Sequence, residues 1–356
     1  MTKPIILSEG KYSAEDLQRL LKQSEIWRKL DLYKIQLEEL FEISYPSGGS
    51  DKSAVDHKKQ FINDHLGKHS DLQGDWIYFP WSGLLLHTLP QKYLFKLRTN
   101  RNQLLITAEE QEKLYNSCIG LVGLSNGNSA AVGLQYQGIA KTLKLADFDN
   151  LATTNLNRVK ANLSDVSLPK IEITSKQIYE INPECKIISF PEGLNENNLD
   201  NFVNSDPKPQ LIVEIIDDFE MKIRLRLKAR EAGISVVMFS NLGDSVLVDM
   251  ERFDLNPKLE LFNGKIGNMA EKILEQGVHS EEINKYAVEI VGKENVPQRA
   301  LETLSEINKT LVGRPQLSST VNISGALCSY IARKIILGDK NLSGRIIISL
   351  DELFKI

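Results

Sequence analysis

The spacing of hydrophobic positions changes twice along the chain and divides it into three regions. Up to about residue 97, apolar residues recur every three or four positions, as on the buried face of amphipathic helices. The positions with this spacing are Leu17, Leu20, Leu21, Trp27, Leu37, Leu40 and Phe41. Ser13 and Asp16 have the spacing of a helix capping box. Residues 75–81 (DWIYFPW) have the aromatic content of a short strand ended by proline, and residues 47–50 (SGGS) predict a loop.

These features predict a helix-rich α/β accessory region at residues 1–97. The aromatic side chains of residues 75–81 suit either a packed core or a binding platform, and core packing is the preferred interpretation. The role of this region is left open.

Between about residues 98 and 250, short apolar runs alternate with amphipathic stretches. The runs predicted to be strands are 119–123, 142–146, 186–190, 211–216 and 235–239. Residues 219–232 have helical spacing and are followed by Gly233. Strands and helices that alternate in this way form right-handed βαβ units. We therefore predict an α/β fold with a Rossmann-like, doubly wound and mainly parallel sheet that carries helices on both faces.

The last third of the chain is predicted to be a helical extension. Residues 318–337 form a long, largely apolar helical pattern that ends at Gly338, and residues 345–350 predict a final strand. We expect residues 98–356 to form one domain, with a nucleotide-binding core at 117–250 and a helical part at 251–356.

Composition and charge narrow the classes of function. The chain has 356 residues, of which 42% are hydrophobic and 25% charged, as in ordinary globular proteins. Its 43 Lys and Arg residues against 47 Asp and Glu residues give a net charge of −4, which argues against nucleic acid or an anionic membrane as the main partner. Three separated cysteines without a CxxC pair argue against a disulfide framework or a cysteine zinc site. With no signal peptide pattern and no membrane-length apolar run, we expect a cytoplasmic protein.

The predicted strand at 119–123 ends in a glycine turn, Gly123-Leu-Ser125-Asn126-Gly127, before a predicted helix. Strand, small-residue turn and helix start together form a phosphate site, because backbone N–H groups and the helix dipole point at the anion. Gly123 is expected to permit the tight turn and Gly127 a close approach of ligand to backbone. In such a sheet the ligand lies at the carboxyl ends of the strands, which places the site directly after Gly123, Ala146 and Ile216.

Three interpretations of this turn are open. In a dinucleotide site, Asp147 would be the ribose-binding acid, at about the expected 20-residue spacing from the turn. In a hydrolase, Ser125 would be a G-x-S-x-G nucleophile, but only one histidine, His279, follows it in the chain. In a triphosphate site, Arg158 and Lys170 would bracket the phosphates and Asp147 or Asp149 would hold the sugar. A lysine at a helix start is unfavourable for the helix dipole unless a negative group lies nearby, which favours the third interpretation over solvated surface charges.

The ordered set of motifs resembles the adenylation core of the ThiF/MoeB superfamily, to which ubiquitin-activating enzymes are related. In that family a glycine-rich turn is followed by D-x-D, N-L-x-R, a lysine, N-P and, after the next main strand, an aspartate in a D-N-F-x-x-R context. The matching positions here are 123–127, 147–149 (DFD), 155–158 (NLNR), Lys170, 182–183 (NP) and 217–222 (DDFEMK). Upstream, residues 98–102 (RTNRN) match the family's R-Y-S-R-N pattern.

The resemblance implies an ATP-dependent adenylyltransferase that converts a carboxylate, such as the C-terminus of a ubiquitin-like protein or peptide, into acyl-AMP and pyrophosphate. It implies that Asp217 holds Mg²⁺ and that Arg101, Arg158 and Lys170 neutralise charge on the phosphates. The implied nucleotide-binding positions are Gly123, Ser125, Asn126, Gly127, Asp147, Asp149, Asn155, Arg158 and Lys170. A homodimer in which Arg101 reaches the partner chain's triphosphate, with residues 251–356 in the dimer contact, is also implied.

Three departures from the family pattern keep two alternatives open. The glycine motif is reduced to Gly123 and Gly127, the family's zinc CxxC pairs are absent, and no cysteine stands at the family's thioester position. Some relatives that adenylate a peptide carboxylate also lack a catalytic cysteine. One alternative is an NAD- or FAD-binding Rossmann protein, which would explain Asp147 but not Asn155, Arg158, Lys170 and Asp217. The other is a nucleotide-binding scaffold that has lost turnover.

Overall fold

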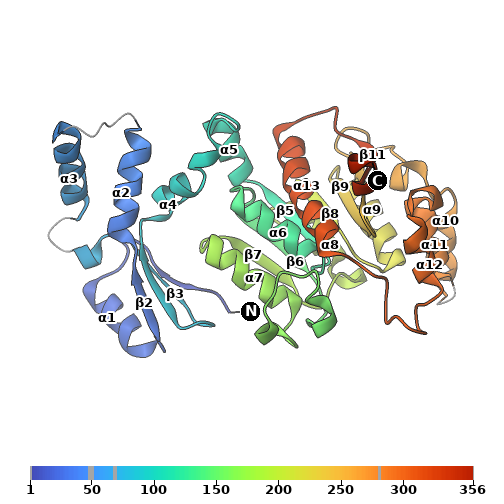
Figure 1. The fold of residues 1–356 in the computed structure, drawn as a ribbon, viewed down its shortest axis with the longest axis horizontal. Helices are drawn as coiled ribbons and strands as arrows, with labels where there is room; N and C mark the ends of the chain where they lie inside the picture. Colours follow the sequence, from blue (N-terminus) through green and yellow to red (C-terminus); the bar gives the residue numbers. More distant parts are fainter. Residues whose placement is uncertain (1, 47–51, 67–69, 280–281, 356) are drawn as a thin grey trace. The chain divides into compact units, whose positions relative to one another are not determined.

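The computed structural model describes residues 2–46, 52–66, 70–279 and 282–355 of the chain (Figure 1). The chain divides into two compact units. The first contains Met1–Ala108 and Tyr179–Glu184, and the second contains Glu109–Ile178 and Cys185–Ile356. The boundary predicted at residues 97–98 therefore falls inside the first unit. The loop predicted at residues 47–50 lies outside the described residues.

The first unit is built on a four-stranded sheet with the strand order β1-β3-β4-β2. Strand β3 pairs antiparallel with β1 and β4, and β2 pairs parallel with β4. The strands are β1 (Ile5–Leu7), β2 (Arg28–Asp31), β3 (Asp75–Phe79) and β4 (Leu84–Thr88). The helices are α1 (Ala14–Gln23), α2 (Tyr33–Ser44), α3 (Lys52–Leu66) and α4 (Gln91–Arg98).

The sequence predicts some of these N-terminal elements and misses others. Ser13 and Asp16 form the expected capping box at α1, and the aromatic strand is confirmed as β3, where Trp76 is 2% exposed and stacks on His87. Strands β1, β2 and β4 were not expected, because each has at most five residues and β2 is mostly charged. The assignment of Trp27 to a buried helix face is wrong, since this residue precedes β2 and is 74% exposed.

The second unit contains a seven-stranded sheet with the strand order β11-β10-β9-β8-β5-β6-β7. Strands β9, β8, β5, β6 and β7 run parallel, and β10 pairs antiparallel with both β9 and β11, so the predicted mainly parallel sheet is confirmed. Strand β10 was missed. The strands are β5 (Cys118–Val122), β6 (Thr142–Ala146), β7 (Lys186–Phe190), β8 (Leu211–Glu214), β9 (Ser235–Leu242), β10 (Ser245–Glu251) and β11 (Gly344–Ser349).

Helices cover both faces of this sheet, as expected of a doubly wound fold. Val122, Ile212 and Val236 share a core with α8 (Glu196–Asn204) and α9 (Phe219–Glu231). Their neighbours along the strands point to the other face and are equally buried. Helix α13 (Ser318–Leu337) contacts β8, β9 and β10 and packs on α6 (Gly127–Tyr136).

Helices α6 and α13 approach closely because both carry glycine at their contact. A Cβ atom at Gly325 would lie 2.9 Å from Ser129, and one at Gly133 would lie 2.9 Å from Ser329 Oγ. The remaining helices are α5 (Ala108–Tyr115), α7 (Lys170–Ile181), α10 (Met269–Gln276), α11 (Ile283–Val291), α12 (Gln298–Leu304) and α14 (Leu350–Phe354). No helix among the described residues is both long and apolar enough to cross a membrane.

Buried charges tie helix α9 to strands β8 and β10. The Arg226 guanidinium is fully buried, and it donates from Nη1 to Glu214 Oε2 at 2.7 Å and from Nε to Glu251 Oε2 at 2.6 Å. It also lies over the Phe262 ring, 3.8 Å from the centroid. Lys222 Nζ donates to Glu214 Oε1 at 2.7 Å. Burial alone would raise the pKa of Glu214, but Lys222 and Arg226 hold that pKa below its usual range. These contacts fix the end of β8, which borders the site described below.

Replacing Arg226 by methionine should destabilise the fold strongly, because two buried carboxylates would lose their shared cation. We expect a loss of about 3–5 kcal/mol in the free energy of unfolding, measured by urea denaturation. Arg224→Met is the matched control, since Arg224 lies on the same helix and pairs with Glu220 and Glu196 at the surface. Exposed pairs contribute at most about 1 kcal/mol. Equal losses for the two variants would show that the buried pairs do not hold α9 in place.

Candidate functional site

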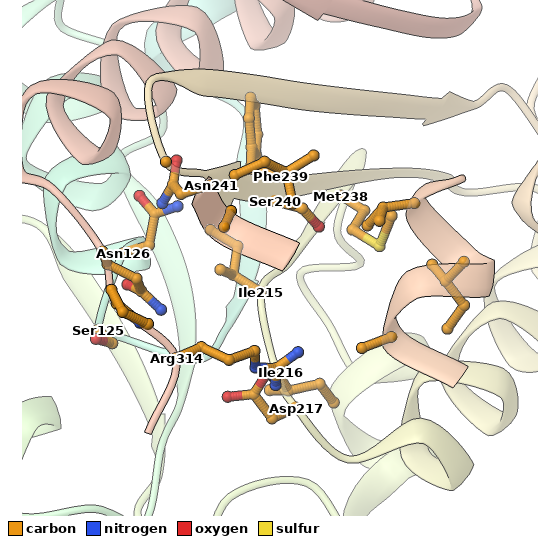
Figure 2. Close-up of a pocket in the computed structure, with 18 of the residues that line it drawn as sticks. Ser125, Asn126, Ile215, Ile216, Asp217, Met238, Phe239, Ser240, Asn241 and Arg314 are labelled. Carbon is orange, nitrogen blue, oxygen red and sulfur yellow. Dashed lines mark hydrogen bonds and ion pairs between the residues drawn. The ribbon is translucent and has the colours of Figure 1, made fainter. Parts of the chain in front are cut away.

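A cavity of about 350 Å³ lies in the second unit at the carboxyl edge of the sheet, where β5, β6 and β8 end. Figure 2 shows Ser125 and Asn126 on one side of this cavity, Met238 on the opposite side, and Arg314 pointing at Asp217. The charged and amide residues that line it include Asn126, Asp149, Asn155, Arg158, Lys170, Asp217, Arg314 and Gln316. The structure thus brings together seven of the residues predicted for the site, these being Ser125, Asn126, Asp149, Asn155, Arg158, Lys170 and Asp217.

The glycine turn at the end of β5 requires glycine at its first position only. Gly123 has φ +89°, and a Cβ atom there would lie 2.3 Å from the carbonyl oxygen of Ile215. Gly127 is the first residue of α6, where a Cβ atom would make only an ordinary contact, 3.6 Å from Leu124 Cδ2. No described neighbour therefore demands glycine at 127, and the close approach predicted there would concern a ligand.

Several buried polar atoms on the cavity wall have no hydrogen-bond partner. They belong to Ser125 (Oγ), Asn126 (Oδ1 and Nδ2), Arg158 (Nε) and Gln316 (Oε1). Asn126 is 3% exposed and directly precedes α6, yet its side chain does not cap that helix. Leaving such a group buried and unpaired costs about 1–3 kcal/mol. Four side chains with this property around one cavity indicate a polar ligand that supplies the missing partners.

Asp147 holds the glycine turn in place. Its Oδ2 accepts the Leu124 N–H at 2.6 Å, and its Oδ1 accepts the Asp149 N–H at 2.9 Å. Burial raises the pKa of this carboxyl group. Asp147 is not among the residues that line the cavity. Of the two aspartates predicted to bind the ribose, Asp149 is therefore the one that faces the cavity.

Asp149 and Lys170 form an ion pair on the cavity wall. Lys170 Nζ lies 2.7 Å from Asp149 Oδ2, and the Lys170 backbone N–H donates to the Asp149 carbonyl at 2.9 Å. Lys170 begins α7, as predicted from the preceding proline. The sequence argument required a negative group to offset a lysine at this helix start, and Asp149 already provides one. The half-exposed Asp149 carboxylate keeps access to the cavity, whereas the lysine is buried.

Arg158 is oriented by the loop that precedes it. Its Nη1 donates to the Thr154 carbonyl at 3.2 Å and to Asn157 Oδ1 at 2.9 Å. Burial lowers the pKa of Arg158, and the nearby Asp217 carboxylate opposes this shift. Asn155 accepts the Ala152 N–H through Oδ1 at 3.0 Å, which leaves its amide nitrogen for other partners. The N-L-N-R segment therefore presents a fixed guanidinium to the cavity.

Asp217 and Asp218 have different roles at the start of α9. Asp218 caps the helix, since its Oδ1 accepts the Met221 N–H at 2.9 Å. Asp217 is 85% exposed, lines the cavity and pairs with Arg314 Nη2 at 2.5 Å. Asp218 is thus committed to the helix cap, which leaves Asp217 available to a ligand.

Arg314 and Gln316 are cavity residues that the sequence did not indicate. Both lie in the segment that precedes α13, and Asn157 Nδ2 donates to the Gln316 carbonyl at 2.8 Å. An isolated arginine in a polar stretch carries no motif, so only the fold reveals that it lies beside Asp217, 97 positions away.

Some predicted features are not brought to the cavity. Arg101 belongs to the first unit, in an exposed turn at Asn100–Asn102, so its role stays a prediction. Cys118, Cys185 and Cys328 are buried and do not line the cavity. Burial raises the pKa of Cys118 to about 11 and that of Cys328 to about 12, so neither thiol is readily ionised. No histidine lines the cavity within the described residues, which removes the base that a Ser125 nucleophile would need.

A dedicated metal cage is not found in the part of the chain that the structure describes, where no three His, Cys, Asp or Glu side chains converge. Mg²⁺ held by one carboxylate and by ligand phosphates needs no such cage. Magnesium at Asp217 and the absence of zinc both stay predictions.

The model of the ThiF family matches residues 99–347. An uncharacterized protein of Mycobacterium tuberculosis (strain CDC 1551 / Oshkosh) is 32% identical over 76% of this chain and 37% of its own length. The tRNA threonylcarbamoyladenosine dehydratase of Bacillus subtilis (strain 168) is 31% identical over 44% of this chain and 60% of its own length. The chain thus spans 37% and 60% of these two relatives. The crystal structure of PaaA covers 74% of this chain and 78% of its own, with 21% identity and a TM-score of 0.50, which supports the fold.

The different positions of Asp147 and Asp149 lead to a stability prediction. Asp147→Ala removes the acceptor of two backbone N–H groups and should lower the free energy of unfolding by about 1–3 kcal/mol. Asp149→Ala removes the partner of Lys170, but Lys170 lines the cavity, so water can replace the lost carboxylate and the change should cost less. Chemical denaturation of both variants, at equal protein concentration, measures the difference. If Asp149→Ala is the more destabilising change, Asp147 does not anchor the turn.

Proposed function

Because the chain belongs to the ThiF family, we propose that it is an adenylyltransferase that activates a carboxylate with ATP. The observation that carries the proposal is the ring of unpartnered polar atoms of Ser125, Asn126, Arg158 and Gln316 around one cavity. The same cavity holds the cations that a polyphosphate needs.

The proposed arrangement places the triphosphate between the turn at Ser125–Asn126 and the side chains of Arg158 and Lys170. Backbone N–H groups at the start of α6 and the two cations favour a polyanion at this position. Asp149 is the residue proposed to hold the ribose, because it lines the cavity while Asp147 is committed to the backbone. Asp217 would hold Mg²⁺, which when bound neutralises phosphate charge.

The proposed reaction is a displacement at the α-phosphorus. A carboxylate oxygen forms a bond to that phosphorus, the bond to the bridging oxygen breaks, and pyrophosphate leaves with the electron pair. Acyl-adenylate remains. Such a step depends on positioning and on stabilisation of charge more than on acid–base groups. The fixed guanidinium of Arg158 and the Lys170 ammonium supply that stabilisation from this chain.

The site favours ATP over a nicotinamide or flavin cofactor. A nicotinamide or flavin cofactor does not require cations at both Arg158 and Lys170, and the best-placed ribose acid for such a cofactor, Asp147, is turned to the backbone. A scaffold without turnover would bind ATP and leave it intact, so it differs from the proposal in activity and not in binding.

The proposed partners are a substrate, defined by its chemical class, and a second copy of the chain. We propose a carboxylate-bearing peptide or small protein as substrate, and a homodimer in which Arg101 assists the partner's site. The name of the Bacillus subtilis relative, tRNA threonylcarbamoyladenosine dehydratase, refers to a tRNA. The expectation that nucleic acid is not a partner of this chain therefore stays a prediction. A ubiquitin-like substrate and a cytoplasmic location likewise stay predictions.

ATP should bind in preference to NAD. Isothermal titration calorimetry of the purified chain with each nucleotide, in the presence of Mg²⁺, measures this preference. Arg158→Ala should weaken ATP binding at least about tenfold, or about 1.4 kcal/mol, because one fixed guanidinium is lost from the triphosphate. Tight binding of NAD with no binding of ATP would remove the adenylation proposal.

Asp217→Asn should abolish the dependence of ATP affinity on Mg²⁺ and leave the melting temperature almost unchanged. Asparagine lacks the charge that the metal requires, and helix α9 keeps its cap because Asp218 provides it. The measurement compares ATP affinity in Mg²⁺ and in EDTA for the wild type, Asp217→Asn and the control Asp218→Asn. A stable Asp217→Asn protein that keeps the full Mg²⁺ effect would exclude Asp217 as the metal ligand.

A further inference from the structure

The cavity changes in character along the edge of the sheet. Most of its charged and amide side chains come from the segments that follow β5, β6 and β8 and from the segment before α13, and Lys222 of α9 and Asn241 of β9 also line it. On the side of α11 and α12 the wall is mainly apolar, and β9 contributes apolar Met238 and Leu242 together with polar Ser240 and Asn241. The residues of this apolar lobe are Leu242, Val288, Val291, Val296, Ala300 and Leu304. Figure 2 shows Met238 of β9 on the same side, opposite Ser125 and Asn126.

The apolar lobe contains no free charge among the described residues that line it. The two carboxylates of the cavity, Asp149 and Asp217, both belong to its polar end. Lys222 also lines the cavity, but its Nζ is bound to Glu214 Oε1 at 2.7 Å and lies 3.6 Å from Met238 Sδ. Burying an unpaired charged group in such surroundings is unfavourable, whereas burying an aliphatic group is favourable.

The lobe joins the polar end beside the groups proposed to handle the α-phosphate. Phe219 is 5% exposed and lines the cavity two positions after Asp217, on the first turn of α9. A molecule with its apolar part in the lobe would therefore present its other end near Asp217, Arg314 and Arg158. Two of these three groups are cations, which suit a carboxylate.

We propose that the apolar lobe binds the group attached to the activated carboxyl carbon, and that this group is branched aliphatic or aromatic. This rests on the proposed function, which it deepens by giving the substrate class. The same chemistry occurs in a free monocarboxylic acid and in the C-terminal residue of a peptide. The polyanionic backbone of a nucleic acid has no counterpart in this lobe.

Binding and exchange with matched carboxylates test this substrate class. The probes are 4-methylpentanoate, N-acetyl-Ala-Ala-Leu and N-acetyl-Ala-Ala-Asp. The full chain is loaded with α,β-methylene-ATP and Mg²⁺ for calorimetry, and ATP–pyrophosphate exchange is followed in parallel. The leucine peptide or the free acid should bind at least about tenfold more tightly than the aspartate peptide, as expected for a hydrophobic pocket.

The outcomes distinguish a peptide from a free acid as the source of the carboxylate. They also distinguish failure of the substrate class from failure of the proposed function. Preference for the peptide identifies a C-terminal residue, and preference for the free acid identifies a small molecule. Equal or tighter binding of the aspartate peptide, or no binding of either apolar probe to protein that does bind the nucleotide, overturns the substrate class and leaves nucleotide binding intact. Failure of the nucleotide itself to bind removes the proposed function and this inference with it.

Two variants locate the effect in the lobe. Ala300→Phe fills it and should raise the KM for the apolar probe at least about tenfold, with the KM for ATP unchanged. Arg299→Phe is the matched control. Arg299 directly precedes Ala300 on the same helix, but its side chain is exposed and does not line the cavity. Val288→Ala enlarges the lobe and should shift the preference from a leucine to a phenylalanine C-terminus. An unchanged KM and an unchanged preference in folded variants would contradict the assignment.

Discussion

The site depends on hydrogen bonds that continue the parallel ladder just beyond the end of β5. The Ile215 N–H donates to the Val122 carbonyl at 2.8 Å, and the Gly123 N–H donates to the Ala146 carbonyl at 2.9 Å. These two bonds bring the segments that follow β8 and β6 against the glycine turn. The carbonyl of Ile215 then leaves no space for a side chain at position 123. This close approach of three backbones therefore positions the polar groups that follow β5, β6 and β8.

Polar groups in the core and on the cavity wall differ in whether they have partners within the chain. Buried charges below the cavity are compensated, since Arg226 and Lys222 neutralise Glu214 and Glu251. On the cavity wall, by contrast, neutral polar atoms of Ser125 and Asn126 have no hydrogen-bond partner. A protein tolerates such groups where a ligand supplies the partner. The concentration of such atoms on one wall, from Ser125, Asn126, Arg158 and Gln316, is the physical basis for assigning function to this cavity.

Much of the second unit could be predicted from sequence, because its elements are local patterns. The strands that begin at Cys118, Thr142 and Lys186, and the helix from Ser318 to Leu337, are visible as apolar runs with clear ends. Strand β10 was missed because its alternation includes Asp249 and Glu251, whose burial depends on Arg345 and Arg226 elsewhere in the chain. The short strands of the first unit escaped prediction because their pairing partners are distant in sequence.

In the candidate site, too, local patterns could be predicted from sequence and long-range contacts could not. Seven cavity residues were predicted because they lie directly after strands or in ordered motifs. The different roles of Asp147 and Asp149 could not be predicted, since both fit D-x-D and only backbone geometry separates them. Arg314 and the apolar lobe formed with α11 and α12 arise from long-range packing, which no local pattern encodes.

The central claim is that this cavity is a nucleotide site formed by the chain's own residues. A crystal structure of the full chain with α,β-methylene-ATP and Mg²⁺ tests it most directly. The account predicts phosphate oxygens within hydrogen-bond distance of Asn126 and Arg158, the ribose at Asp149, and Arg314 displaced from Asp217 by the metal. An analogue bound elsewhere on the protein, with the Asp217–Arg314 pair intact and the side chains of Ser125 and Asn126 still without partners, would contradict it.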